Sequence, residues 1–380
     1  MDPHAQAPAA VPPPPVAAPL PSWVPRRLES VYRRVAPYLG ALAFIAGFTW
    51  DSLTLTRVDR LLDNFILLTY LLGLGAMLVL HHRTGVFRAA WPRLAPRREL
   101  LDFAARWCFG GLYSAYVVLY FKSASTWPSL LFVVLLAALM LVHELRPAER
   151  PRMRVSFFCL CAFSFLLFFI PVVSGYLGPW VFPAAGALAL LGGVTLGWAM
   201  ERGARAPSAI FRRHLAASAI VLVPMFVLDK LEMIPPIPLA LLDRGVFHDV
   251  TRTDAGFEVR YERAAWPSWR REDRVFHIGD AQPAFCFTAV FAPHGIDVGI
   301  VHAWEWWDPA SGWSETDRIP YEVEGGRGGG YRVYTKKRAL RAGEWRVRVL
   351  TDAGRELGRC EFTAVEGEGE GVRWGSRIID

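Results

Sequence analysis

The sequence predicts an α-helical membrane bundle of about seven spans, followed by an all-β sandwich domain. Three observations lead to this expectation. Apolar stretches fill most of residues 35–230, arginine gathers at alternate ends of these stretches, and beyond residue 245 the apolar residues repeat with the period of a strand. The hydrophobic fraction of 53% and the mean hydropathy of +0.25 agree with a chain that is largely embedded in lipid.

Five stretches approach the length that a membrane span needs. A spanning helix takes about 20 mostly apolar residues, because lipid offers a bare backbone no hydrogen-bond partner. Two further stretches are weaker: residues 38–50 are few and end at Asp51, and residues 215–228 follow His214 and contain Pro224. The five clear stretches are residues 65–80, 107–121, 127–142, 155–173 and 179–200.

Lysine and arginine predict the orientation. With seven spans, one set of loops and ends holds 18 of these residues and the other set holds 4, namely Arg57, Arg60, Lys122 and Lys230. Omitting either weak span would spoil this asymmetry. Cytoplasmic loops are the ones enriched in lysine and arginine, so we expect a multi-pass plasma-membrane protein with a cytoplasmic N-terminus and an extracytoplasmic C-terminal domain.

The positive charge belongs to the hydrophobic half of the chain. Residues 1–245 hold 23 Lys and Arg against 13 Asp and Glu, whereas residues 246–380 hold 19 against 22. The isoelectric point near 9.3 therefore reflects membrane topology, and no nucleic-acid partner is expected.

The predicted spans lack charged residues in their middle thirds, which argues against ion-coupled transporters and proton pumps. A retinal protein is disfavoured too, because Lys122 and Lys230 lie at membrane edges. One enzymatic alternative stays open: a membrane-embedded enzyme or carrier for a lipid-linked substrate. Its polar edge residues would be Asp51, Asp63, Asn64, His143 and Glu144.

Composition divides the chain into five segments. Residues 1–34 are rich in proline and alanine, contain no signal-peptide pattern, and predict a disordered cytoplasmic tail. Residues 35–230 form the transmembrane domain, and the proline-containing residues 231–245 are expected to be an extended linker. The β domain follows at 246–365, and an acidic, glycine-rich tail at 366–380.

Short β-rich strings fill the last third of the chain. The strings "FEVRYERA", "AFCFTAVFAP", "IVHAWEWWD", "YRVYTKKRAL", "EWRVRVLTD" and "ELGRCEFTAV" are each bounded by glycine, proline or aspartate. Such a series of seven to nine short strands in about 120 residues favours an immunoglobulin-like sandwich.

Three motifs within these strings resemble the bacterial domain-of-unknown-function family 2914. The motifs are the Cys-Phe-Thr strand at 286–288, the pair His302 and Trp304, and the closing Gly343, Trp345 and Val347. The resemblance covers roughly residues 245–365 and implies an envelope location and a β-rich fold, but no chemistry. The glycine-rich "VEGGRGGGYR" departs from the family pattern, and we expect a loop there.

Aromatic residues in "IVHAWEWWDPASGW" are the first candidates for binding. In an extended strand, Trp304 and Trp306 share one face and Trp307 the other. We expect Trp304 and Trp345 in the core, while Trp306, Trp307 and Trp313 could bind sugar rings or anchor the domain at a lipid interface.

A cationic stripe is the second candidate. Arg332, Tyr334, Lys336 and Arg338 alternate along one predicted strand and so share a face, with Arg341 close by. This face could meet anionic lipid headgroups or an acidic cell-wall polymer. It could equally be an ordinary solvated sheet face.

The remaining chemistry-bearing residues predict neither a metal site nor a cofactor site. His248, His277, His294 and His302 lack the tight spacing of metal ligands. Glu305 and Asp308 resemble surface carboxylates more than a glycosidase pair, and we predict no catalytic residue.

Cysteine offers one structural test. Cys286 and Cys360 fall on separate predicted strands, and an oxidising compartment would permit a bridge between them. Strand positions alone do not show that their side chains meet.

These observations favour a non-enzymatic envelope protein in which the spans anchor a sandwich that binds or senses a surface component. An accessory subunit, with a membrane-protein partner, is the third hypothesis.

Overall fold

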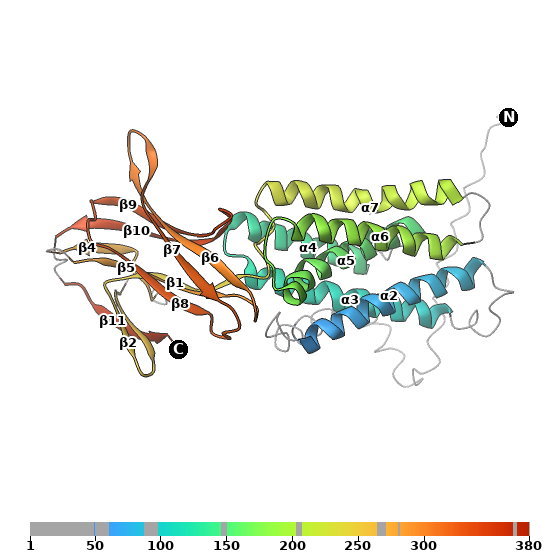
Figure 1. The fold of residues 1–380 in the computed structure, drawn as a ribbon, viewed down its shortest axis with the longest axis horizontal. Helices are drawn as coiled ribbons and strands as arrows, with labels where there is room; N and C mark the ends of the chain where they lie inside the picture. Colours follow the sequence, from blue (N-terminus) through green and yellow to red (C-terminus); the bar gives the residue numbers. More distant parts are fainter. Residues whose placement is uncertain are drawn as a thin grey trace, which may run out of the picture. The chain divides into compact units, whose positions relative to one another are not determined.

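The computed structural model describes residues 49, 61–86, 98–145, 150–202, 207–263, 271–279, 282–367 and 371–379. Within these ranges a series of six long helices precedes eleven strands (Figure 1). The helices are α2 (Leu61–Val86), α3 (Arg98–Ser123), α4 (Trp127–Leu145), α5 (Pro151–Ser174), α6 (Val181–Glu201) and α7 (Pro207–Lys230).

Four of the described helices are long and apolar enough to cross a membrane: α2, α5, α6 and α7. In α4 a shorter apolar helix covers Trp127–Val142. The weak stretch at 215–228 belongs to the full-length helix α7, which continues through Pro224. The other weak stretch, residues 38–50, lies outside the described residues, so the count of seven spans is not confirmed.

Aromatic packing and small residues hold the helices together. On α6, Phe182 meets Phe163 of α5 at 5.0 Å and Phe226 of α7 at 4.9 Å, edge to face in both cases. A Cβ atom added to Gly197 would collide with the ring of His214, which is fully buried. The glycine-rich face of α6 therefore allows α7 to approach closely.

Ion pairs tie the arginine-rich ends of these helices. Asp102 of α3 contacts Arg106 at 2.7 Å and Arg154 of α5 at 2.8 Å. At the end of α6, Glu201 contacts Arg213 at 2.9 Å and His214 at 3.1 Å. Some of the arginines counted as cytoplasmic thus have structural partners.

The eleven described strands form three sheets. We call β1-β5-β8 the middle sheet, β4-β10-β9-β6-β7 the five-stranded sheet, and β11-β3-β2 the small sheet. The strands are β1 (Ala240–Phe247), β2 (Asp249–Thr253), β3 (Gly256–Glu262), β4 (Val275–Ile278), β5 (Ala284–Phe291), β6 (Asp297–Asp308), β7 (Gly312–Glu324), β8 (Tyr331–Lys337), β9 (Gly343–Thr351), β10 (Glu356–Glu366) and β11 (Trp374–Ile379). All pairs are antiparallel except β4 with β10.

Strand β5, the central strand of the middle sheet, is buried on both of its faces. On one face, Cys286 packs with Trp304 and Trp345 of the five-stranded sheet. On the other, Phe287 packs with Val259 of the small sheet. A strand covered on both faces needs apolar residues in succession, which explains the uninterrupted run "AFCFTAVF" in β5. The predicted sandwich is confirmed, and the small sheet adds a third layer.

Two predicted boundaries differ from the structure. Part of the expected linker, from Ala240 onward, is strand β1, because it pairs with β5 and buries Ala240, with Leu241 packed against the core. Part of the expected C-terminal tail is β11, which pairs with β3 and places Ile379 in the layer between the small and middle sheets.

Candidate binding surfaces

The predicted binding residues lie on two different sheets. Trp306, Trp307 and Trp313 belong to β6 and β7 of the five-stranded sheet, whereas the cationic stripe belongs to β8, at the edge of the middle sheet. Alternation along a strand predicts which residues share a face, but the sheet to which a strand belongs follows from long-range pairing. The structure therefore divides the candidates into two separate surfaces.

The tryptophans of "EWWDPASGW" gather at the β6–β7 turn. Trp307 is 40% exposed and meets Trp313 edge to face at 5.4 Å. The guanidinium of Arg346 lies 4.1 Å from the ring centre of Trp313. Trp306 points to the opposite face of β6, is half-buried, and donates its indole N–H to the carbonyl of Ala342 at 3.2 Å. Trp307 is thus the most accessible ring of the three.

The predicted core tryptophans are buried. Trp304 is 0% exposed and Trp345 is 2% exposed, and both pack in the main core of the sandwich. Each indole N–H has an acceptor: the hydroxyl of Thr335 at 3.1 Å for Trp304, and the carbonyl of Arg341 at 2.7 Å for Trp345.

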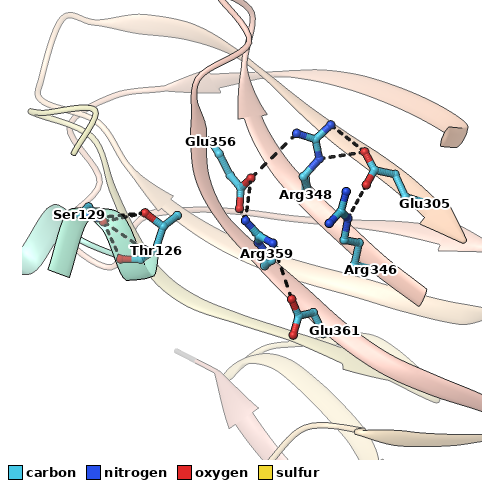
Figure 2. Close-up of polar contacts among 8 residues, drawn as sticks. All are labelled: Thr126, Ser129, Glu305, Arg346, Arg348, Glu356, Arg359 and Glu361. Atoms are coloured by element: carbon cyan, nitrogen blue, oxygen red, sulfur yellow. Dashed lines mark hydrogen bonds and ion pairs between the residues drawn. The ribbon is translucent and has the colours of Figure 1, made fainter. Parts of the chain in front are cut away.

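A ladder of arginine and glutamate residues runs across β6, β9 and β10 (Figure 2). Glu305 is 4% exposed and accepts hydrogen bonds from Arg346 and, at 2.8 Å, from Arg348. The ladder continues through Glu356, which lies 4.0 Å from Arg348 and 2.7 Å from Arg359, and ends at Glu361, 3.8 Å from Arg359. Three positive and three negative groups make it electrically neutral.

No local sequence pattern predicts this ladder. The alternation of "EWRVRV" and "GRCEF" places charged residues on one face of β9 and of β10. Their register, with Arg346 opposite Glu361 and also opposite Glu305, comes only from the sheet pairing.

Glu305 and Asp308 bind different partners. Glu305 is held by two arginines, whereas Asp308 accepts hydrogen bonds from the Ala310 amide at 3.0 Å and from the Ser311 hydroxyl at 2.8 Å. These two bonds lower the pKa of Asp308 and stabilise its ionised form. Each carboxylate therefore has a structural partner of its own.

The cationic stripe borders the small sheet. Tyr334 is 42% exposed, and its ring lies 5.7 Å from Phe285 of β5 and 6.3 Å from Phe257 of β3. Lys336 is exposed on the same face of β8, and Arg332 is half-buried. Lys337 points the other way and bonds to Asp317. The face is thus a shallow aromatic patch flanked by cations.

Within the described residues, no carboxylate lies within ion-pair distance of Arg332, Lys336 or Arg338. The buried Nε atom of Arg332 also has no hydrogen-bond partner there. Arg252 of β2 stands opposite Phe257 in the register, so it lies on the face of the small sheet whose Phe257 ring borders Tyr334. This surface differs from the glutamate ladder because its positive charge is uncompensated.

Of the four histidines considered as metal ligands, His302 lies in the core. Its Nε2 atom is 3.0 Å from the hydroxyls of Thr288 and Tyr321, and its Nδ1 atom is 2.9 Å from that of Thr335. Burial lowers the pKa of His302 to about 3, so this imidazole is neutral. His294 is exposed in the β5–β6 turn.

His248 and His277 belong to an acid–histidine cluster with Asp273 and Glu262. His248 is 2% exposed; its Nδ1 atom is 2.8 Å from Asp273 and its Nε2 atom 3.0 Å from Glu262. The second oxygen of Glu262 lies 2.7 Å from Nδ1 of His277. Since both ring nitrogens of His248 face carboxylates, the ring is an imidazolium that donates to each.

Electrostatics support this protonation state. Burial lowers the pKa of His248, but the hydrogen bonds to Asp273 and Glu262 outweigh it and raise the pKa to about 9. Burial raises the pKa of Asp273 to about 6 despite the neighbouring imidazolium. No group of three or more His, Cys, Asp or Glu side chains in the described part of the chain is arranged to hold a metal ion.

The two cysteines of the β domain face each other across the core. Their Sγ atoms are 3.9 Å apart, both side chains are buried, and both thiols are free. A disulfide would shorten this distance to about 2.05 Å. The bridge between Cys286 and Cys360 remains a prediction, with its two sulfurs already adjacent.

Of the polar residues of the enzyme hypothesis, the structure describes the side chains of Asp63 and Asn64 alone. Asp51 and the side chains of His143 and Glu144 lie outside the described residues. Asp63 and Asn64 belong to the first turn of α2, and Asn64 is buried at 3% exposure.

The C-terminal domain matches one known family. Residues 298–364, which run from β6 to β10, match the family model described as Protein of unknown function (DUF2914). The match confirms the resemblance of the C-terminal domain. No curated protein matches the chain.

Two solved structures align with the chain at low similarity. An immunoglobulin-like protein from Pseudomonas aeruginosa is 12% identical, with 32% of this chain and 96% of that chain covered and a TM-score of 0.19. The Pseudomonas fluorescens alkylpurine DNA glycosylase AlkC, bound to DNA containing an abasic site analog, is also 12% identical, with 81% and 99% covered and a TM-score of 0.21. At these TM-scores neither similarity bears on function.

Proposed function

We propose that this chain is a multi-pass envelope protein whose β domain binds an anionic surface component outside the membrane. The binding surface is the cationic stripe, Arg332, Tyr334, Lys336 and Arg338, extended by Arg252. The observation that carries the proposal is the lack of any described carboxylate partner for these cations. Four apolar candidate spans and the family match to a domain of unknown function are consistent with it.

The contrast with the glutamate ladder explains the choice of surface. On the five-stranded sheet, three arginines are each bound to a glutamate, so an incoming anion would have to displace an existing ion pair. On β8, the positive field has no such competitor. An uncompensated patch raises the local concentration of anions and speeds their association.

The location outside the membrane rests on arginine asymmetry. Eighteen Lys and Arg residues on one set of loops and ends against four on the other favour a C-terminal domain on the side away from the cytoplasm. There, anionic phospholipid headgroups and phosphate-bearing polymers share the chemistry that guanidinium and ammonium groups recognise.

A binding experiment on the full chain tests the proposal. The protein, in nanodiscs of phosphatidylcholine, is titrated separately with phosphatidylglycerol vesicles and with polyphosphate, so that the two arms distinguish a lipid from a polymer. The test variant is Lys336→Glu with Arg338→Glu, because both side chains are exposed. The matched control is Arg318→Glu with Arg271→Glu, two exposed arginines on β7 and next to β4.

At about 1 kcal/mol per lost cation, the test variant should bind at least one anion about 30-fold more weakly. The control variant should remain within about three-fold of the wild type. Equal affinity of wild type and test variant for both anions, or no binding by the wild type, would show that the stripe is an ordinary solvated surface.

A further inference from the structure

An apolar groove of about 660 Å³ lies between α6 and α7. Its volume falls in the range of small-molecule sites. All of the lining side chains are apolar except one, Lys230. The α6 side includes Gly186 and Ala187, and the α7 side includes Ala219, Phe226 and Lys230.

Small residues keep this groove open. A Cβ atom on Gly186 would lie 2.9 Å from the ring of Phe226, closer than real contacts allow. Glycine therefore lets this ring lie against α6, where it meets Phe182 edge to face at 4.9 Å. Ala187 and Ala219 leave space that larger residues would fill.

The groove has a polar end. Both helices are candidate membrane spans, so we expect the apolar lining at the level of the lipid acyl chains. Lys230 is the last residue of α7. In the described residues no carboxylate lies within ion-pair distance of Lys230, since the neighbouring Asp229 is bound to Arg355 at 2.9 Å. Lys230 is thus the single charged residue of the groove, and it lies at the end of the groove near the membrane boundary.

We propose that this groove holds an acyl chain of a membrane lipid whose anionic headgroup pairs with Lys230. The length of the lining along two helices suits a chain, and the charge at its end suits a phosphate without a compensating ammonium group. A lysine at a helix end extends its ammonium toward the headgroup layer while its methylenes stay in apolar surroundings. This site is independent of the cationic stripe and shares no residue with it.

Native mass spectrometry of the full chain in detergent tests the site. The chain is titrated with phosphatidylglycerol and, separately, with phosphatidylcholine. Lys230→Gln should weaken retention of phosphatidylglycerol about five-fold, the equivalent of one lost cation, and leave phosphatidylcholine unchanged. Ala219→Trp fills the groove and should weaken retention of both lipids.

Two control variants separate the site from general effects. Leu191→Trp adds the same bulk to α6 at a residue that is 60% exposed and not part of the groove. Arg202→Gln removes a cation at the same end of α6 as Glu201. Both should retain lipid as the wild type does. Unchanged retention in Ala219→Trp and Lys230→Gln would overturn the proposal, as expected if another helix or a second copy of the chain covers the groove.

Discussion

Replacing His248 with phenylalanine should destabilise the β domain in a manner that depends on pH. The ring of His248 stacks on Phe276 at 3.9 Å and meets Trp374 edge to face at 4.9 Å, so phenylalanine preserves these aromatic contacts. It removes the imidazolium between Asp273 and Glu262, two carboxylates that are 1% and 8% exposed. Breaking a buried ion pair from one side costs about 3–5 kcal/mol, and we expect a loss of that size at pH 6.5.

The pH dependence follows from the shifted pKa values. The pKa of His248 rises from 6.5 to about 9 on folding, so its contribution is complete below pH 6.5 and disappears as the pH rises through 9. At about 1.4 kcal/mol per pH unit, that contribution is about 3 kcal/mol. Removing His248 should therefore cost most near pH 6.5, and the destabilisation should shrink as the pH rises through 9.

Hydrogen exchange measured by mass spectrometry on the full chain reports the opening free energy of peptides from β2, β3 and β4 at several pH values. His294→Phe is the control, because His294 is exposed in a turn, and it should change nothing. A variant as stable as the wild type at pH 6.5 would refute the reasoning. So would a deficit that stays constant between pH 6.5 and 9.

Three further predictions concern other parts of the chain. Glu305→Gln should lower the stability of the β domain by about 1–3 kcal/mol, because two arginines lose a buried carboxylate; Glu315→Gln, in an exposed pair, should change it by less than about 1 kcal/mol in the same thermal unfolding assay. Under a mild oxidant, Cys286 and Cys360 should form a disulfide, visible as a loss of two maleimide labels after denaturation; two labels retained under every oxidant tried would contradict it. A reporter enzyme that works only in the cytosol, fused after Asp380, should be inactive if the β domain lies outside, and a fully working reporter would reverse the assigned orientation.

The sequence predicts the elements whose signals are local. Periodicity identifies the apolar helices and most strands, and alternation places Trp304 and Trp345 in the core. The continuous apolar run of β5 also indicates a third layer, because a strand with one solvated face would show alternating apolar and polar residues. No covering segment was assigned to its second face, however, because the pairing of β11 with β3 joins residues far apart in the chain.

Long-range register explains what could not be predicted of the candidate sites. The acid–histidine cluster draws on the end of β1, the end of β3, and the segment from Asp273 into β4, and no spacing in the sequence relates His248 to Asp273. The same limit applies to the stripe and the tryptophans. Both were expected to form binding surfaces, but local patterns could not place β8 in one sheet and β6 in another.

The position of β11 has a consequence for how the domain matures. Phe247 and Phe287 on the middle sheet are covered by a layer that includes Ile379, so this apolar surface is incomplete until residues 374–379 have been synthesised and moved to the side of the membrane where the domain folds. A nascent chain at that stage exposes an aggregation-prone aromatic surface and an unpaired edge of β3. Timely arrival of a six-residue strand would then decide between productive folding and aggregation or degradation.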